Sequence, residues 1–109
     1  EDAAAFDAFS ALRAATLGGA KAIGFDHLVG SLEPGKQADI ACVDLSALET
    51  QPLHHVVSQL IYATGRQQVS DVWIAGKPKL SARVLVDMDM DRIIANAKQW
   101  RGRIAAIGR

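Results

Sequence analysis

Apolar and polar residues alternate along the chain in patterns that predict helices near both ends and strands between them. The alanine-rich run 3–15 favours an α-helix, with Asp2 as its cap and Phe6, Phe9 and Leu12 as its bulky side chains. This helix and the one that follows it are interpreted as a helical pair.

Thr16 is predicted to cap a second, short helix that ends at Gly24, because glycine commonly follows the last helical residue. Gly18 and Gly19 lie inside this helix, and each is about 1 kcal/mol less favourable there than alanine. Two such small residues indicate that another backbone approaches the helix closely.

A turn and a strand are predicted next. Pro34-Gly35 suits the central positions of a type II turn, since proline presets the first φ and glycine accepts the positive second one. The run 40–43 is nearly all apolar, which is typical of a strand covered on both faces. Cys42 is interpreted as a small apolar filler of that strand.

One apolar set recurs at i, i+3, i+4, i+7 and i+8 and predicts an amphipathic helix: Leu53, Val56, Val57, Leu60 and Ile61. Pro52 lies just before this helix, where proline is tolerated, and Gly65 is expected to end it.

The run 69–74 is predicted to be a strand, and 75–77 a hairpin turn. Pro78 in the returning strand favours an edge position, because proline has no N–H for a neighbouring strand. Residues 84–86 are a candidate for a further short strand. About three to five short strands are too few to close a barrel or a sandwich, so the predicted sheet is incomplete.

A final helix is predicted with either Asp87 or Asp89 as its cap and Asp91 in its first turn, where negative charge is favourable. Its buried face is expected to contain Ile93, Ile94, Ala97 and Ile104.

Composition and charge narrow the classes of partner. The 109 residues include 12 basic and 12 acidic ones, and this balance gives no electrostatic reason to expect nucleic acid or an anionic membrane. The apolar runs are shorter than the roughly 20 residues of a membrane span. Cys42 is the only cysteine, which favours a reducing, cytoplasmic compartment. The chain begins at Glu1 rather than Met, so we expect a piece of a longer protein.

Two motifs resemble a known family. The segment 11–24 (ALRAATLGGAKAIG) followed by 29–40 (VGSLEPGKQADI) is similar to the C-terminal signature of the amidohydrolase superfamily. The segments 57–66 (VSQLIYATGR) and 69–77 (VSDVWIAGK) resemble the branch of 5-methylthioadenosine/S-adenosylhomocysteine deaminases and triazine hydrolases of the atrazine chlorohydrolase type.

The resemblance implies an α+β fragment of a larger fold. Residues 1–27 would be the last helices of a (β/α)₈ barrel, and residues 28–86 the C-terminal share of a small composite β-sandwich with one inserted helix. Residues 87–109 would form a C-terminal helix that packs back on the body. The N-terminal remainder of the same enzyme would supply the missing strands.

The same resemblance implies a metal-dependent parent enzyme, with zinc or another divalent metal, that hydrolyses C–N bonds of a purine or triazine-like substrate, in a homodimer. The family's metal ligands include a His-x-His motif, two later histidines and an aspartate, and these would all precede Glu1. We therefore expect no catalytic, substrate-binding or metal-binding residue here and an inactive isolated chain. The alternatives are a self-standing interaction or scaffold module and another amidohydrolase branch, of the guanine or cytosine deaminase type.

Several side chains are candidate exceptions to the expectation that no metal-binding residue lies in this chain. His54 and His55 are adjacent, about 100° apart on a helix, and unsuited to chelating one ion together. A solvated or hydrogen-bonded surface role is favoured for both, and a loop position for His27. Ser70-Asp71 echoes the family's metal-binding Ser/Thr-Asp only faintly, because a hairpin follows it.

Two aromatic residues and three glycines leave alternatives open. Trp73 is either core on the second face of the sheet, which is favoured, or part of a subunit contact. Tyr62 lies off the helix stripe, and the sequence does not decide its role. Gly18-Gly19 and Gly30 match no phosphate-binding pattern, so close packing and turns are expected at these positions.

Overall fold

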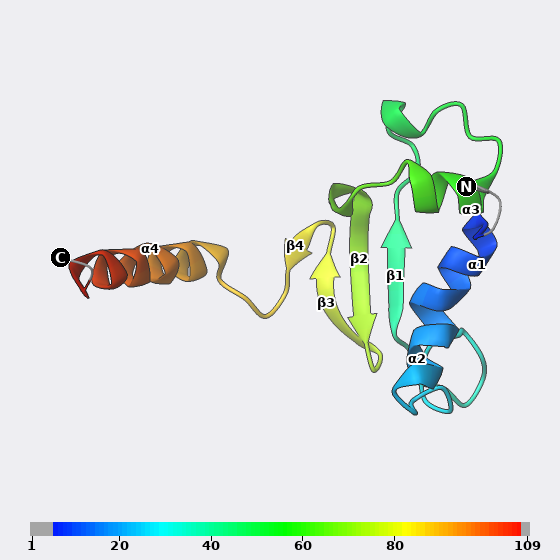
Figure 1. Cartoon of the computed structure of the whole chain (residues 1–109), viewed down its shortest axis with the longest axis horizontal. Coiled ribbons are helices and arrows are strands. Elements are labelled where there is room, and N and C mark those ends of the chain that lie inside the picture. Colours follow the sequence, from blue (N-terminus) through cyan, green and yellow to red (C-terminus); the bar gives the residue numbers. More distant parts are fainter. Residues whose placement is uncertain (1–5, 108–109) are drawn as a thin grey trace.

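The computed structural model describes residues 6–107, which form a four-stranded antiparallel sheet with helices at both of its ends (Figure 1). The strands are β1 (Ile40–Val43), β2 (Val69–Ile74), β3 (Lys77–Ser81) and β4 (Val84–Leu85), and they lie side by side in that order. This is a mixed α/β architecture, as predicted. β1 ends the order, so its outer edge has no neighbouring strand within the described residues.

A single helix replaces the two that the sequence predicts. α1 (Ala8–Arg13), a π-helical turn (Ala14–Gly18) and α2 (Gly19–Ala22) follow one another without a break, because the residues at both junctions keep right-handed helical dihedrals. Thr16 therefore does not cap a second helix. Its hydroxyl donates to the carbonyl of Leu12 at 2.8 Å, one turn earlier.

Asp7 caps this helix by accepting a hydrogen bond from the Ser10 N–H at 2.7 Å. The cap predicted at Asp2 lies outside the described residues. The helix ends as predicted at Gly24, whose φ of +76° is open to glycine at little cost.

Gly30 makes the close approach that the small residues of the helix indicate. Its φ is +94°, and an added Cβ would lie 2.8 Å from Ala20 Cβ and 3.0 Å from Leu17 Cα. Gly18 and Gly19 are crowded by the carbonyls of Arg13 and Ala14, five residues earlier in the same continuous helix, rather than by Gly30. Another backbone does approach the helix closely, as predicted. The contact is made by Gly30 of the following loop against Leu17 and Ala20 of the helix.

The type II turn is confirmed, since Gly35 has a φ of +90° and the Lys36 N–H donates to the Glu33 carbonyl at 3.1 Å. The hairpin is also confirmed, with a turn at Ala75 and Gly76 between β2 and β3. Pro78 lies opposite Trp73 of β2, in the part of β3 beyond its Leu80 and Ser81 pairs with β4. Because β3 lies between β2 and β4, it is not an edge strand and the predicted edge position is wrong for the strand, although Pro78 itself has no partner residue in β4.

α3 (Val56–Tyr62) begins three residues later than the apolar spacing predicts. Leu53 precedes the helix, and His55 is its N-cap residue with extended dihedrals. α3 packs against α1. Gly65 follows the helix, as predicted, and precedes the short 3-10 turn Arg66–Gln68 that leads into β2.

α4 (Met90–Ile107) departs most clearly from expectation, because it points away from the rest of the chain (Figure 1). Asp89 caps it by accepting from the Arg92 N–H at 3.0 Å, whereas Asp87 pairs with Lys79 at 2.7 Å. The predicted buried face is exposed: Ile93 is 44% and Ile104 67% accessible. The helix has its apolar face, but nothing among the described residues covers it.

The interior is correspondingly small. Ala8 and Ala20 are the only buried apolar residues between positions 6 and 107. The radius of gyration is 18.6 Å, whereas a compact chain of this length would have about 13 Å. The predicted two-sided cover of β1 is absent as well, since Ala41 and Cys42 are exposed.

Candidate functional site

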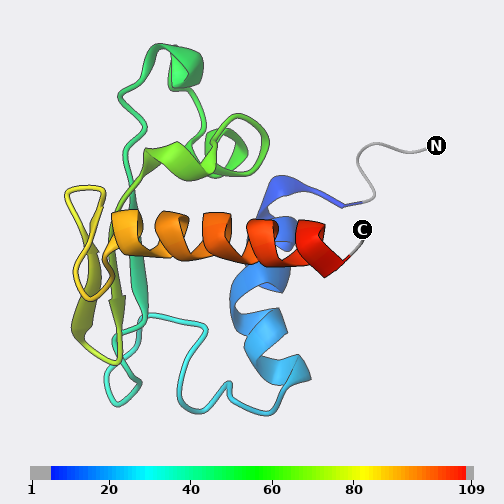
Figure 2. The ribbon, with the colours of Figure 1, turned by 90° about the vertical axis from the view of Figure 1, so that its left-hand side faces the viewer.

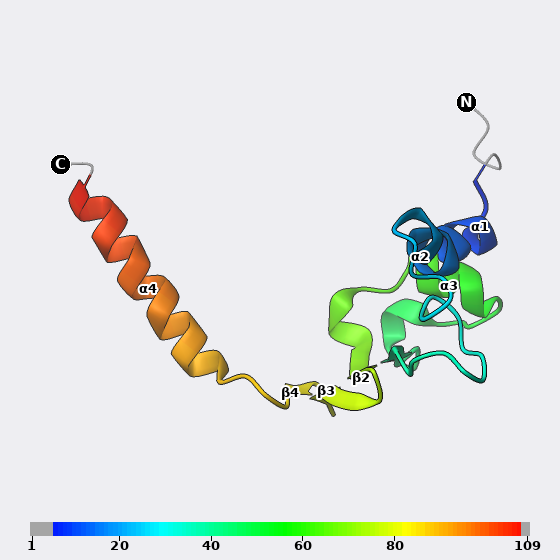
Figure 3. The same cartoon turned by 90° about the horizontal axis from the view of Figure 1, so that it is seen from below.

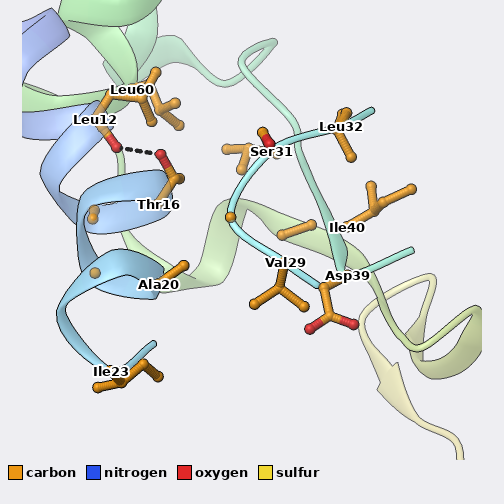
Figure 4. A pocket seen from close by; sticks show the side chains of 15 residues that line it. Leu12, Thr16, Ala20, Ile23, Val29, Ser31, Leu32, Asp39, Ile40 and Leu60 are labelled. Carbon is orange, nitrogen blue, oxygen red and sulfur yellow. Dashed lines mark hydrogen bonds between the residues drawn. The ribbon is translucent and has the colours of Figure 1, made fainter. Parts of the chain in front are cut away.

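The main concavity of the described chain is an open groove of about 620 Å³ between the N-terminal helix and β1 (Figure 4). Thr16, Ala20 and Ile23 of the helix face Val29, Leu32 and Ile40 across it, and Leu60 of α3 lies at one end. The lining is mainly apolar. Such a surface suits another apolar element better than a polar metabolite.

The polar groups around the groove are engaged within the chain. The Thr16 hydroxyl donates to Leu12, as the dashed line in Figure 4 marks. The Asp39 carboxylate accepts a hydrogen bond from the Ala75 N–H at 2.7 Å. This bond ties the residue before β1 to the β2–β3 turn, and the Gly76 N–H adds a bond to the Ala38 carbonyl at 3.0 Å. These groups therefore hold the sheet together rather than await a ligand.

The remaining polar residues of the family-like motif build their own turn. Lys36 Nζ donates to the Ser31 hydroxyl at 2.6 Å and lies 3.0 Å from Glu33 Oε2. Ser31 in turn donates to Glu33, and this bond, together with Lys36, lowers the pKa of the Glu33 carboxyl. The motif therefore acts as a structural clasp before β1.

The three histidines lie on the surface, as favoured. His27 is in the turn after the N-terminal helix, and His54 is exposed in the segment before α3. His55 Nδ1 accepts from the Ser58 N–H at 3.2 Å and lies 3.0 Å from the Ser58 hydroxyl. The apolar spacing predicted that His54 and His55 lie on the helix, and this prediction is wrong. His54 precedes α3, and His55 is its N-cap residue.

No set of three or more His, Cys, Asp or Glu side chains within residues 6–107 is arranged to hold a metal ion. Asp71 accepts a hydrogen bond from the Ala82 N–H at 3.0 Å, which lowers the pKa of its carboxyl. That bond fixes the β3–β4 turn, where Ala82 and Arg83 have positive φ values of 45° and 66°. Asp71 thus has a structural partner in place of an ion.

Three further predicted positions have mixed outcomes. Cys42 was expected to be buried and is exposed, because the face of β1 that carries it has no cover in this chain. Trp73 is half-buried within β2, which fits partial cover of the sheet. Tyr62 is 68% exposed at the end of α3.

One ion pair that links distant segments could not be predicted from the sequence. Arg83 Nη2 lies 3.0 Å from Asp44 Oδ2, and Arg83 Nε donates to the Gln67 carbonyl at 3.1 Å. Asp44 and Arg83 are 39 positions apart, and only the strand pairing brings them together.

No helix between residues 6 and 107 is long and apolar enough to cross a membrane.

Comparison with known proteins decides the family. The sequence profile of the amidohydrolase family matches residues 1–79. The chain belongs to the amidohydrolase family. Its resemblance to that family in the segments 11–24 and 29–40 is thereby confirmed.

Relatives of this amidohydrolase chain include a 5-methylthioadenosine/S-adenosylhomocysteine deaminase from Teredinibacter turnerae, 50% identical over 96% of the chain and 24% of the relative. Among solved structures, an adenosine deaminase from Xanthomonas campestris with bound zinc is 70% identical and has a TM-score of 0.94. The match covers 96% of this chain and 24% of that one. An atrazine chlorohydrolase from Arthrobacter aurescens, complexed with zinc, is 32% identical over 86% of this chain and 20% of that one, with a TM-score of 0.79.

The amidohydrolase chain therefore spans about a quarter of the length of these relatives. Both enzyme types of the branch indicated by the segments 57–66 and 69–77 are among them.

Proposed function

We propose that the chain is the C-terminal part of a zinc-dependent amidohydrolase that deaminates a purine nucleoside thioether such as 5-methylthioadenosine or S-adenosylhomocysteine. The observation that carries the proposal is the 50% identity to a deaminase with this name over 96% of the chain. In the reaction, the ring carbon exchanges its amine for an oxygen from water, and ammonia is released. The zinc in the two solved relatives supports the choice of metal.

The chain's own contribution is structural. Residues 6–107 hold no set of side chains that fits a zinc ion, and the polar groups of the groove are bonded to their own backbone and turns. No step of the reaction is assigned to this chain, and its catalytic, substrate-binding and metal-binding residues are proposed to lie elsewhere in the parent. The cytoplasmic location and the homodimer stay predictions, which cell fractionation and light scattering would measure.

The proposed domain division follows the same boundaries as the sequence prediction. Residues 1–27 would belong to the barrel, 28–86 to a composite sandwich, and 87–109 to a terminal helix. The open edge of β1 supports the sandwich assignment, because strands from the rest of the parent have an edge to extend. The apolar groove supports the barrel assignment, because it leaves the N-terminal helix uncovered on one side.

Product release by the zinc-loaded full-length parent tests the function. It is measured as ammonia from 5-methylthioadenosine, S-adenosylhomocysteine, adenosine, guanine and cytosine, and as chloride from atrazine, each as a separate substrate. We expect turnover of the first two and none by residues 1–109 alone. Turnover by the isolated chain would refute the structural role. Turnover of atrazine alone would make the parent a triazine hydrolase of the same branch, and turnover of guanine or cytosine alone would move it to another branch. An inactive parent would favour the scaffold alternative.

A further inference from the structure

α4 carries a continuous apolar stripe. With 100° of rotation per residue, seven side chains fall within about 140° of the helix surface. They are Met90, Ile93, Ile94, Ala97, Trp100, Ile104 and Ile107. The opposite face carries Asp91, Arg92, Gln99 and Arg103 instead. This division is typical of a helix with one covered face.

The stripe is uncovered within the described chain. Its large side chains are between 44% and 85% exposed, and Trp100 is 60% exposed. Arg103 lies over the Trp100 ring at 5.1 Å, a contact within the helix itself. An apolar stripe of this length is unusual on a surface that remains in water.

The outward position of α4 is shared with a much longer folded protein. The helix makes up 18 of the 109 residues, about one sixth of the chain. The Xanthomonas campestris structure matches 96% of the chain with a TM-score of 0.94, a value that is out of reach with one sixth of the residues placed elsewhere. The helix therefore stands away from the sheet in that longer protein too.

The position of α4 also defines where its cover would lie. α4 and the helix of residues 8–22 extend from opposite ends of the sheet toward the same side, as Figures 2 and 3 both show. The Lys79–Asp87 ion pair and the Asp89 cap fix the point at which α4 leaves the sheet. A single folded domain on that side of the sheet could therefore contact both the apolar stripe of α4 and the apolar groove.

We infer that the α4 stripe docks on the part of the same parent polypeptide that precedes residue 1. This inference rests on the proposed function only in requiring a longer parent. The match covers 24% of the length of each of two relatives, which leaves about three quarters of such a polypeptide to provide the cover. In this arrangement the apolar stripe of α4 contacts the rest of the parent beyond β4, and the apolar groove beside β1 contacts it at the opposite end of the sheet.

Two alanines of α4 give a matched test. Ala97 lies in the stripe, and Ala95 lies two residues away on the opposite side of the helix. The same change, to aspartate, is made at each position in the full-length parent. Ala97→Asp buries a charge if the stripe is covered, whereas Ala95→Asp leaves the charge in water.

Hydrogen exchange of α4 amides and thermal unfolding are measured on the parent and both variants. We expect slow exchange in the parent that persists on dilution to the monomer. We also expect a lower melting temperature and faster α4 exchange in Ala97→Asp, with Ala95→Asp unchanged.

Three results would overturn the inference. They are α4 exchange as fast as in a peptide of residues 86–107, equal effects of the two variants, and protection that disappears on dilution. The last would assign the stripe to a second copy of the chain. None of these readouts depends on deaminase activity, so failure of the proposed function is recorded separately by the ammonia assay.

Discussion

The guanidinium of Arg83 lies 3.0 Å from the carboxylate of Asp44 and joins the β3–β4 turn to the end of β1. Hydrogen bonds from Ser46, with a further contribution from Arg83, lower the pKa of Asp44 to about 2 from its ordinary 3.8. Because the folded-state pKa is the lower one, Asp44 stabilises the fold above pH 3.8, and this contribution is lost as the pH falls toward 2.

Asp44→Asn in the full-length parent is expected to lower stability at pH 7 and to leave little difference from the unmodified protein at pH 2. Urea unfolding at both pH values measures this difference. Asp26→Asn, at a carboxylate without a recorded ion pair among residues 6–107, is the control. An Asp44→Asn effect that does not change with pH would contradict the prediction.

Gly30 is predicted to tolerate no side chain, for two separable reasons. Its φ of +94° disfavours other residues, and its Cβ position is occupied by Ala20 and Leu17. Gly35 has a similar φ of +90° but open space around its Cβ position. Gly35→Ala is therefore expected to cost about 1 kcal/mol from backbone strain, and Gly30→Ala about 1–3 kcal/mol more from overpacking.

Chemical unfolding of the two alanine variants of the parent measures these costs. Equal destabilisation would show that the loop at Gly30 relaxes away from the helix.

His55 is predicted to stabilise the start of α3, because Nδ1 accepts from the Ser58 N–H. Loss of an N-cap acceptor costs about 0.5–2 kcal/mol, so His55→Ala is expected to lower the unfolding free energy of the parent by that amount. His55→Asn retains an acceptor and restores most of it. His54→Ala, at the exposed neighbour, is the control, and an equal loss at both positions would argue against a capping role.

Cys42 is predicted to change its reactivity with context. It is exposed in the described chain, so residues 1–109 alone react rapidly with a thiol reagent, whether folded or not. In the native full-length parent, the rest of the polypeptide is expected to cover this face of β1 and to slow the reaction. Denatured parent is the control, and equally fast labelling of the native parent would show that this face of β1 stays open.

Local elements of the fold follow directly from the sequence. The strand 40–43, the Pro34-Gly35 turn and the hairpin at 75–77 depend on short-range preferences, and the structure has all three. The continuity of the helix through Gly18 and Gly19 was not predictable from propensity. A penalty of about 1 kcal/mol per glycine disfavours a helix without forbidding it, and the π-helical turn accommodates both.

Long-range relationships were beyond the sequence. The apolar spacing of α4 indicates which face requires cover, but not which surface supplies it, so the packing of this helix on the body of the parent stays a prediction. The Asp39–Ala75 bond and the Asp44–Arg83 pair arise from strand pairing. The family-like motif identified the family correctly, whereas the hydrogen bonds of its Asp39 and the ion pair of its Lys36 depend on the folded arrangement of the chain.

The unpaired edge of β1 also has a consequence in time. In the proposed parent, the strands that pair with β1 are translated before this chain, and at about 5–20 residues per second the 39 residues that precede β1 take on the order of 2–8 s. Strands translated earlier spend that interval without the partner that completes their sheet. We therefore expect the nascent enzyme to need a chaperone until β1 emerges, and translation stalled before Ile40 to leave an aggregation-prone product.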